Sequence, residues 1–385
     1  GGMNNVVTRT VAEEALGVSL PSRRLEEWKW TDLKRLVDRA YSVSVVDADA
    51  AIIERLAKSA PLADVMLPRI LIVNGQIHSK SDSVRITRAA PAIAHADPLL
   101  SLNVKLQAKS ICLQFEENID QPVEVLHITT GQGAAVASRL HVSVAAGASA
   151  TVIETFVGEG EYLHNPITTI DIAKGGRLDR VKIETESASA QHLSHVIATI
   201  ADNAILNDFT LTAGAVLNRQ NANIDFNGQN SSAKVAGSYL LNDNQHADTR
   251  LIVDHKVPHC MSRELFKCVM DEKARGIFQG KVIVRPNAQK IDGKQSSHAL
   301  LLSETAEFDA KPELEIYADD VICGHGTTCG DLNPDHMFYL KSRGIPAAEA
   351  RVMLVEAFVD EAVDTIENQT VREAVLAMVH KRLFQ

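Results

Sequence analysis

The feature that most constrains the fold is a long stretch, from about residue 70 to about residue 330, in which apolar and polar residues alternate with a period of two. Such alternation is typical of β-strands, whose side chains point to opposite faces in turn. Turn sequences interrupt it at Gly147, Gly175, Asn203 and Gly228, in steps of 28, 28 and 25 residues. Regular steps of this length indicate units that bury their apolar faces only by stacking. The pattern predicts a parallel β-helix, a form of β-solenoid, with a large β-sandwich of evenly spaced turns as the alternative.

Helical signals precede this stretch. Thr10 and Glu13 have the spacing of a capping box, in which each side chain accepts a hydrogen bond from a free backbone amide at the start of a helix. A second helix is predicted from Asp49 to Ser59, where apolar residues recur at helical spacing. The Asn74-Gly75 pair then predicts a β-hairpin at the start of the β region.

Helical signals return after the β region. Asn333-Pro334 supplies an N-cap and a proline at the first helical position, and Pro346 opens a longer helix. Thr370 and Glu373 predict another capping box at the start of the last helix. We expect these helices to cap the open end of the β stack, to dock a partner protein, or both.

The chain therefore divides into three regions. At 385 residues it exceeds the length at which one hydrophobic core keeps growing, and its 45% apolar content is that of a folded protein. We predict a mainly β protein with an N-terminal helical region at 3–68, a β-helix core at 69–332 and a C-terminal helical region at 333–385.

Charge and cysteine content exclude several classes of function. A net charge of −10 offers no basic surface for nucleic acid. Five cysteines are too few for a disulfide scaffold of this length and favour the reducing cytoplasm. No apolar run approaches the roughly 18 residues of a membrane span, and no secretory signal is evident at the N-terminus. We therefore expect a cytoplasmic protein that binds neither nucleic acid nor membrane.

Common catalytic motifs are absent from the sequence. The nearest approach to a phosphate-binding loop, Gly276–Val282, has the wrong spacing and lacks a hydroxyl group to hold magnesium. Serine-hydrolase, zinc-protease and paired CxxC motifs are also missing. We expect a protein that is not an enzyme and that binds no nucleotide itself.

One segment, Asp319–Gly330, combines metal-binding residue types. In an extended strand, Cys323 and His325 point to the same face and offer a soft sulfur beside an imidazole, which suits iron, zinc or a cluster intermediate. Two ligands do not complete a site, so others must come from Cys329, from distant residues such as His255 or His259, or from another chain. The alternative is that Cys323 is a small buried apolar residue and His325 a turn residue.

A second mixture of histidine and cysteine occurs at Asp254–Cys260. It contains Pro258, which favours a turn. We interpret this segment as a polar loop between two turns of the solenoid.

Taken together, several segments resemble the SufB/SufD family of the bacterial and plastid Suf machinery, which assembles iron–sulfur clusters. They are Pro21–Leu33 with its arginine, tryptophan and threonine residues, Val73–Gly75, Arg275–Lys281, Ala288–Lys290, Leu300–Ser303, Pro312–Ile316, Asp319–Thr327 and Phe338–Ile345. Chain length and the tryptophan segment favour the SufD branch over SufB. The sequence departs from the family pattern at Gly293, Gly324 and Cys329.

The resemblance implies a right-handed β-helix that pairs with a SufB-like paralogue and forms a homodimer when isolated. It implies that the C-terminal helices dock a SufC-like ABC-type ATPase, with partner-binding residues in the family segment and the helix after it: Phe338, Tyr339, Arg343, Gly344 and Phe358. It also implies that His325, with Cys323 as the less certain contributor, faces a cysteine of SufB and holds iron or a nascent Fe–S cluster transiently.

Two other functions compete with this scaffold hypothesis. The first is an independent metalloprotein with a closed mononuclear zinc or iron site at Cys323, His325 and Cys329. The second is a β-helical enzyme that acts on carbohydrates, although no pair of carboxylates stands out in the sequence.

Overall fold

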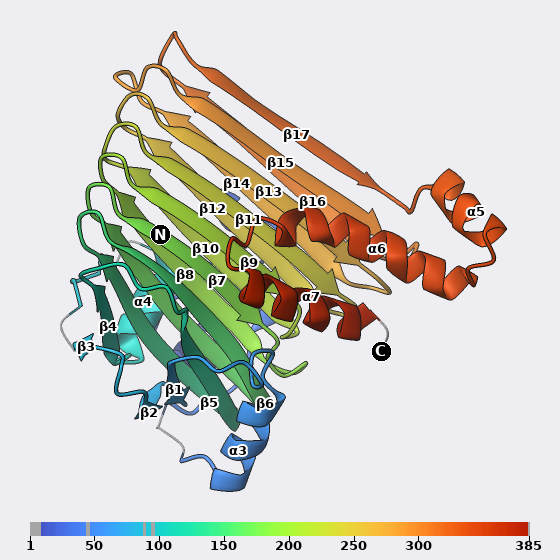
Figure 1. Ribbon diagram of the computed structural model, residues 1–385. Helices are drawn as coiled ribbons and strands as arrows, with labels where there is room; N and C mark the ends of the chain where they lie inside the picture. The colour runs from blue at the N-terminus through green and yellow to red at the C-terminus, as the bar shows by residue number, and fades with distance from the viewer. Residues whose placement is uncertain (1–8, 44–46, 88–89, 94–96, 384–385) are drawn as a thin grey trace, which may run out of the picture.

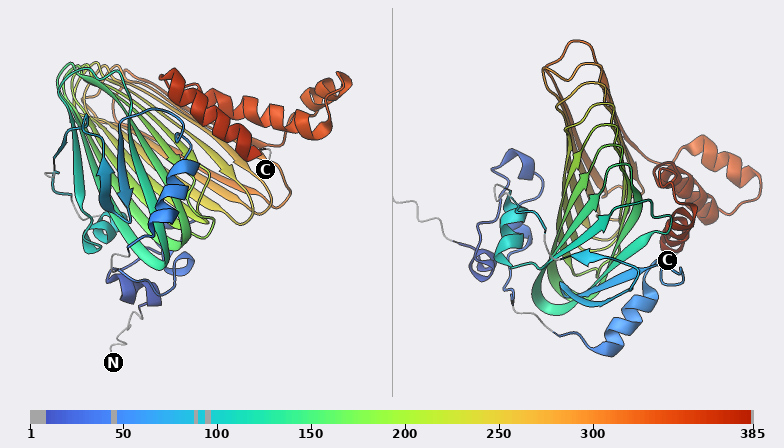
Figure 2. Two further views of the ribbon diagram at one scale, coloured as in Figure 1. Left: turned by 60° about the horizontal axis from the view of Figure 1, so that its bottom comes forward. Right: turned by 60° about the vertical axis from the view of Figure 1, so that its left-hand side comes forward.

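The computed structural model describes residues 9–43, 47–87, 90–93 and 97–383. It is a parallel β-solenoid of about 8 turns, with helices toward both ends of the chain. Figures 1 and 2 show the stacked strands and the helices beside them. The predicted mainly β fold is therefore confirmed, and the β-sandwich alternative is wrong. No helix of the described residues is long and apolar enough to cross a membrane.

The strands stack in register along the solenoid. In chain order they are β1 (Arg69–Val73), β2 (Gln76–Lys80), β3 (Ile86–Thr87), β4 (Ser110–Phe115), β5 (Val123–Val144), β6 (Ser149–Ile172), β7 (Arg177–Glu184), β8 (Gln191–Ile200), β9 (Ile205–Thr212), β10 (Leu217–Phe226), β11 (Ser232–Leu241), β12 (His246–His255), β13 (Met261–Met270), β14 (Arg275–Val284), β15 (Asp292–Leu301), β16 (Glu307–Ile316) and β17 (Ile322–Gly330). They form one continuous sheet that folds into two facing layers, because β5 and β6 run from one layer into the other. The first layer continues through β8, β10, β12, β14 and β16, and the second through β7, β9, β11, β13, β15 and β17.

The turns at one corner explain the repeat. Gly147, Gly175 and Asn203 all have positive φ, and the amide of each donates to a carbonyl of the next turn. The fourth predicted position was wrong: the residue with positive φ at this corner is Asn230, with φ 56°, and the last step is 27 residues. Gly228 is instead needed for close approach, because a Cβ there would lie 1.8 Å from a backbone nitrogen of the preceding turn.

Helices precede the first strand, interrupt the first turns and follow the last strand, and the two longest are at the C-terminus. They are α1 (Val11–Leu16), the 3₁₀ helix η1 (Glu26–Trp28), α2 (Leu33–Leu36), α3 (Ala50–Ser59), α4 (Pro98–Lys105), α5 (Pro334–Ser342), α6 (Ala347–Val363) and α7 (Gln369–Leu383). The capping box of α1, the start of α3 at Asp49, the hairpin of β1 and β2 and the N-cap at Asn333 are confirmed. The predicted cap of the last helix was wrong: Asn368 Oδ1 accepts the Val371 amide at 3.0 Å, and Thr370 lies inside α7.

The helices cover the two outer faces of the solenoid. Near the N-terminus, Trp28 and Leu33 pack with Leu163 and Leu193 on the first layer. On the second layer, α6 and α7 form an apolar contact with β7, β9 and β11. Figure 1 shows both helices lying over this face of the solenoid. The C-terminal helices therefore do not cap the end of the stack as we expected. Their apolar stripes match the apolar outer face of the second layer, which would otherwise contact water.

Candidate functional site

The segment with metal-binding residue types forms β17, the last strand of the second layer. β17 pairs with β15 in parallel, with Cys323 opposite Gly293 and His325 opposite Gln295. The predicted extended conformation places Cys323 and His325 on one face. Cys323 packs against the apolar core between the layers, so this face is the interior of the solenoid.

This end of the solenoid is uncovered. Among the described residues, β17 pairs with β15 alone, and no strand follows it in the stack. Cys323 is therefore half-buried and His325 is exposed. Apolar side chains around the edge are exposed as well, with Tyr317 at 58% and Ile322 at 68%. An open edge with exposed apolar groups is typical of a surface that another chain covers.

Two buried polar side chains lie behind His325. The register places Glu264 of β13 opposite Gln295, which in turn lies opposite His325. Both side chains are 2% exposed, and among the described residues neither makes a hydrogen bond of normal geometry, although Ser262 lies near enough to Glu264 to lower its pKa. Burial raises the pKa of Glu264 to about 8. This pair was not predicted from the sequence, where its one signal is a carboxylate at an inward position of an alternating strand.

The surroundings of Cys323 keep its sulfur protonated. Burial raises the pKa of this thiol, and the Asp292 and Glu264 carboxylates raise it further, against a lowering contribution from a backbone hydrogen bond of Gly293. A metal ion would have to displace the proton before the sulfur could bind. The pair therefore offers the exposed imidazole of His325 as the more available ligand and Cys323 as a second one.

Cys329 lies too far along the strand to share an ion with these two residues. At about 3.3 Å per residue, it is about 13 Å from His325 and about 20 Å from Cys323. The closed mononuclear site of Cys323, His325 and Cys329 is therefore incompatible with the structure, because the three residues occupy one extended strand.

The other candidate ligands also lie apart from this pair. His255 is fully buried, with Nε2 3.1 Å from Ser262 Oγ and its ring stacked on Phe226. His259 is exposed at a solenoid corner with φ 60°, which agrees with the later part of the predicted polar loop. The earlier part of that prediction was wrong, because Asp254 and His255 are the last two residues of β12 and are buried. In the part of the chain that the structure describes, no third ligand joins Cys323 and His325.

The predicted partner-binding residues lie on α5 and α6. No residue of α5 is buried; Phe338 is 75% exposed and Tyr339 is 56% exposed. The Arg343 guanidinium lies 5.3 Å from the centre of the Tyr339 ring. Gly344 follows with φ 86° and turns the chain toward α6. Phe358 differs from the others because it packs within the chain, between α6 and the second layer.

Comparisons with known proteins agree on one family. The model described as SUF system FeS cluster assembly, SufBD core domain, matches residues 127–358, which include β17. The iron-sulfur cluster assembly protein SufD of Escherichia coli strain K12 is 30% identical over 96% of this chain and 91% of its own length. An iron-sulfur cluster assembly SufBD family protein of Mycobacterium leprae is 28% identical over 94% of this chain and 91% of its own. SufD of Bacillus subtilis is 34% identical over 30% of this chain and 26% of its own.

Proposed function

This chain belongs to the SufBD family of the SUF system of iron–sulfur cluster assembly, and from that premise we propose that it is a non-catalytic scaffold subunit on which clusters form. The observation that carries the proposal is the uncovered end of the solenoid, where Cys323 and His325 face inward and no other described residue completes the ligand set. An incomplete and exposed ligand set suits cargo that is held transiently between two chains. Iron or a nascent cluster is the cargo.

A SufB-like paralogue is the proposed partner at this end. Supporting this, the free edge and the exposed Tyr317 and Ile322 would be covered by a chain of similar cross-section. The paralogue would place a cysteine opposite His325. In isolation, two copies of this chain would use the same surface as a homodimer. We also expect the solenoid to be right-handed, as parallel strand crossovers almost always are.

A SufC-like ABC-type ATPase is the proposed partner of the C-terminal region. In support, α5 carries exposed aromatic residues and buries none of its own side chains, which is unusual for a helix with no partner. Phe338, Tyr339 and Arg343 would form the contact, with Gly344 setting the direction of α5 and Phe358 supporting α6 from beneath. The ATPase would supply nucleotide hydrolysis to a complex located in the cytoplasm.

The first test is purification of the tagged protein from its native cells under anaerobic conditions. We expect an ABC-type ATPase and a larger paralogue to elute with it. The second test is cluster assembly in a strain that lacks the native protein. His325→Ala should abolish assembly while leaving the complex intact. Normal assembly by His325→Ala would refute the ligand role.

The matched control for this substitution is His78→Ala. His78 is another exposed histidine and lies in the hairpin of β1 and β2, at the opposite end of the solenoid. It should support normal assembly. Purification of the chain without either partner would refute the scaffold assignment, whatever the result with His325.

A further inference from the structure

A group of charged side chains lies inside the solenoid, far from the open end. Along β6 to β10 one part of the interior holds four buried carboxylates and two buried cations: Glu154, Glu184, Glu186, Asp208, Arg180 and Lys182. Arg180 pairs with two of the carboxylates, at 2.6 Å from Glu154 and 2.9 Å from Asp208. Lys182 donates to neutral partners, Ser194 and Gln220. Glu184 and Glu186 thus have no cationic partner within hydrogen-bond distance among the described residues.

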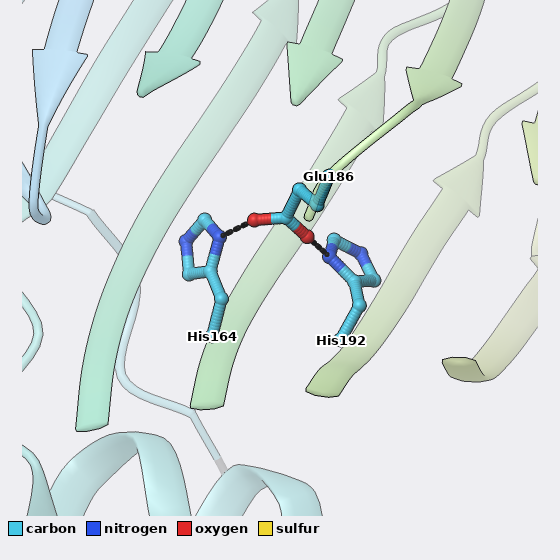
Figure 3. Close-up of side chains that lie close together, drawn as sticks. All are labelled: His164, Glu186 and His192. Carbon is cyan, nitrogen blue, oxygen red and sulfur yellow. Dashed lines mark hydrogen bonds and ion pairs between the residues drawn. The ribbon is translucent and has the colours of Figure 1, made fainter. Parts of the chain in front are cut away.

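Two histidines flank one of these carboxylates, as Figure 3 shows. His164 of β6 and His192 of β8 lie opposite each other in the parallel register, and Glu186 follows β7 in the connection to β8. Glu186 Oε1 lies 3.0 Å from His164 Nδ1, and Glu186 Oε2 lies 2.5 Å from His192 Nδ1. One candidate ligand atom from each residue lies within 4.8 Å of the others, and all three residues are buried.

Neighbouring polar groups hold this triad in place. The Tyr162 hydroxyl donates to Glu186 Oε1 at 3.2 Å, and Ser138 Oγ lies 3.2 Å from His164 Nε2. Such contacts from surrounding residues orient the ligands in metal sites. Nε2 of the fully buried His192 has no hydrogen-bond partner among the described residues. The same is true of both ring nitrogens of His127, whose ring centre lies 5.8 Å from that of His164.

We propose that His164, Glu186 and His192 form a binding site for a divalent transition-metal ion, Fe²⁺ or Zn²⁺, inside the solenoid. Two imidazoles and one carboxylate are a ligand set that suits these ions and not calcium or magnesium, which require oxygen ligands. This site does not rest on the function proposed for His325. Four strand spacings separate β8 from β16, so it lies on the order of 20 Å from the open end.

Charge balance favours a metal ion over a network of hydrogen bonds alone. Two imidazole N–H groups would satisfy Glu186, but with all four carboxylates ionised they would leave two more buried negative charges than positive ones. Buried charges are rarely left uncompensated, and a divalent cation would remove this excess.

The test measures metal in the purified full-length protein. Because the site is enclosed, the metal is supplied during production, in medium supplemented with iron or zinc. The purified protein is then treated with EDTA. Inductively coupled plasma mass spectrometry measures the metal that remains and identifies it. We expect one equivalent to resist the chelator. Glu186→Gln and His192→Asn should lose it, with affinity weakened by more than about 100-fold. His325→Ala should retain it, which separates this site from the open end.

The matched control is His255→Asn, which alters another fully buried inward-facing histidine outside the triad. It should retain the metal. If the triad variants fail to fold, the proposal is tested by the absorption spectrum of wild-type protein produced with cobalt. We expect a spectrum of nitrogen and oxygen ligands without a thiolate charge-transfer band. Wild-type protein without chelator-resistant metal, equal metal in Glu186→Gln, or a thiolate band would each refute the proposal.

Discussion

The guanidinium carbon of Arg219 lies 4.1 Å from the centre of the Trp28 ring, on the outer face of the solenoid. Arg219 also donates to the Glu27 carbonyl at 3.0 Å and pairs with Asp248, which accepts a hydrogen bond from Thr31. These contacts attach the N-terminal segment to β10 and β12. They give the tryptophan and threonine of the family segment a structural role, because both side chains are buried by this attachment.

Trp28→Ala should therefore loosen the N-terminal region. Trp28 is 1% exposed, so its removal leaves a large cavity beside a buried cation. We expect the free energy of unfolding to fall by about 3–5 kcal/mol, measured by urea denaturation. The control is Trp30→Ala, which removes the other tryptophan at a half-buried position and should cost about 1 kcal/mol or less. Equal losses from both variants would contradict the role of Trp28.

Arg180→Met should destabilise the protein through the carboxylates that it leaves behind. Arg180, Glu154 and Asp208 are all buried, and loss of the guanidinium leaves two buried carboxylates without a cation. We expect a loss of about 3–5 kcal/mol in the free energy of unfolding. Arg177→Met is the control in the same strand, because the Arg177 side chain is 36% exposed. An effect no larger than that of the control would show that the interior charges are already neutralised by protons.

Because of Glu264, the free energy of unfolding should decrease as the pH rises. Its pKa is raised from 4.5 to about 8 by burial, so between these values the folded state keeps a proton that the unfolded state has lost. The contribution of Glu264 to the free energy of unfolding must therefore decrease as pH rises through this window. Glu264→Gln should remove that decrease and be more stable than wild type near pH 8 by a few kcal/mol.

The measurement is urea denaturation of both proteins at several pH values across the window. The difference between them isolates Glu264 from the other groups that titrate. Glu307→Gln, at an exposed position of β16, is the control and should follow the wild-type curve. Parallel curves for wild type and Glu264→Gln would mean that the carboxyl group is not held in its neutral form.

The five thiols should react at widely different rates. Cys329 is exposed, Cys323 is half-buried, and Cys112, Cys260 and Cys268 are buried. In labelling with a chromogenic disulfide reagent, we expect one fast thiol, one slow thiol and three that react only after denaturation. Cys329→Ser should remove the fast phase. Rapid reaction of a third thiol would show that the interior opens, and a bound paralogue should protect both Cys323 and Cys329.

Local sequence rules were sufficient to predict the structure wherever the interaction that controls it joins residues close together in the sequence. Gly147, Gly175 and Asn203 were predicted as turn positions because positive φ favours these residue types. The same rule gave a wrong prediction at Gly228, because glycine is needed there for close contact with the preceding turn. The predicted cap at Thr370 was wrong because Asn368, two residues earlier, is also a good capping residue, and only the backbone path of α7 shows which residue takes that position.

The candidate site was predictable to the same degree. The two-residue spacing of Cys323 and His325 sets their common face in any strand. Their distance from Cys329 also follows once the segment is extended. Glu264 and Gln295 could not be placed beside them, because they are 61 and 30 residues distant from His325 and meet it only through the register of β13, β15 and β17.

By itself, the sequence determined the repeating β core, its helical ends and the shared face of Cys323 and His325, because periodicity, caps and turns act over a few residues. Only the tertiary structure decided that the C-terminal helices cover a face instead of the end. It alone brought His164, Glu186 and His192 together. Stacking aligns residues from successive turns across the solenoid, and this alignment depends on the length of every turn between them.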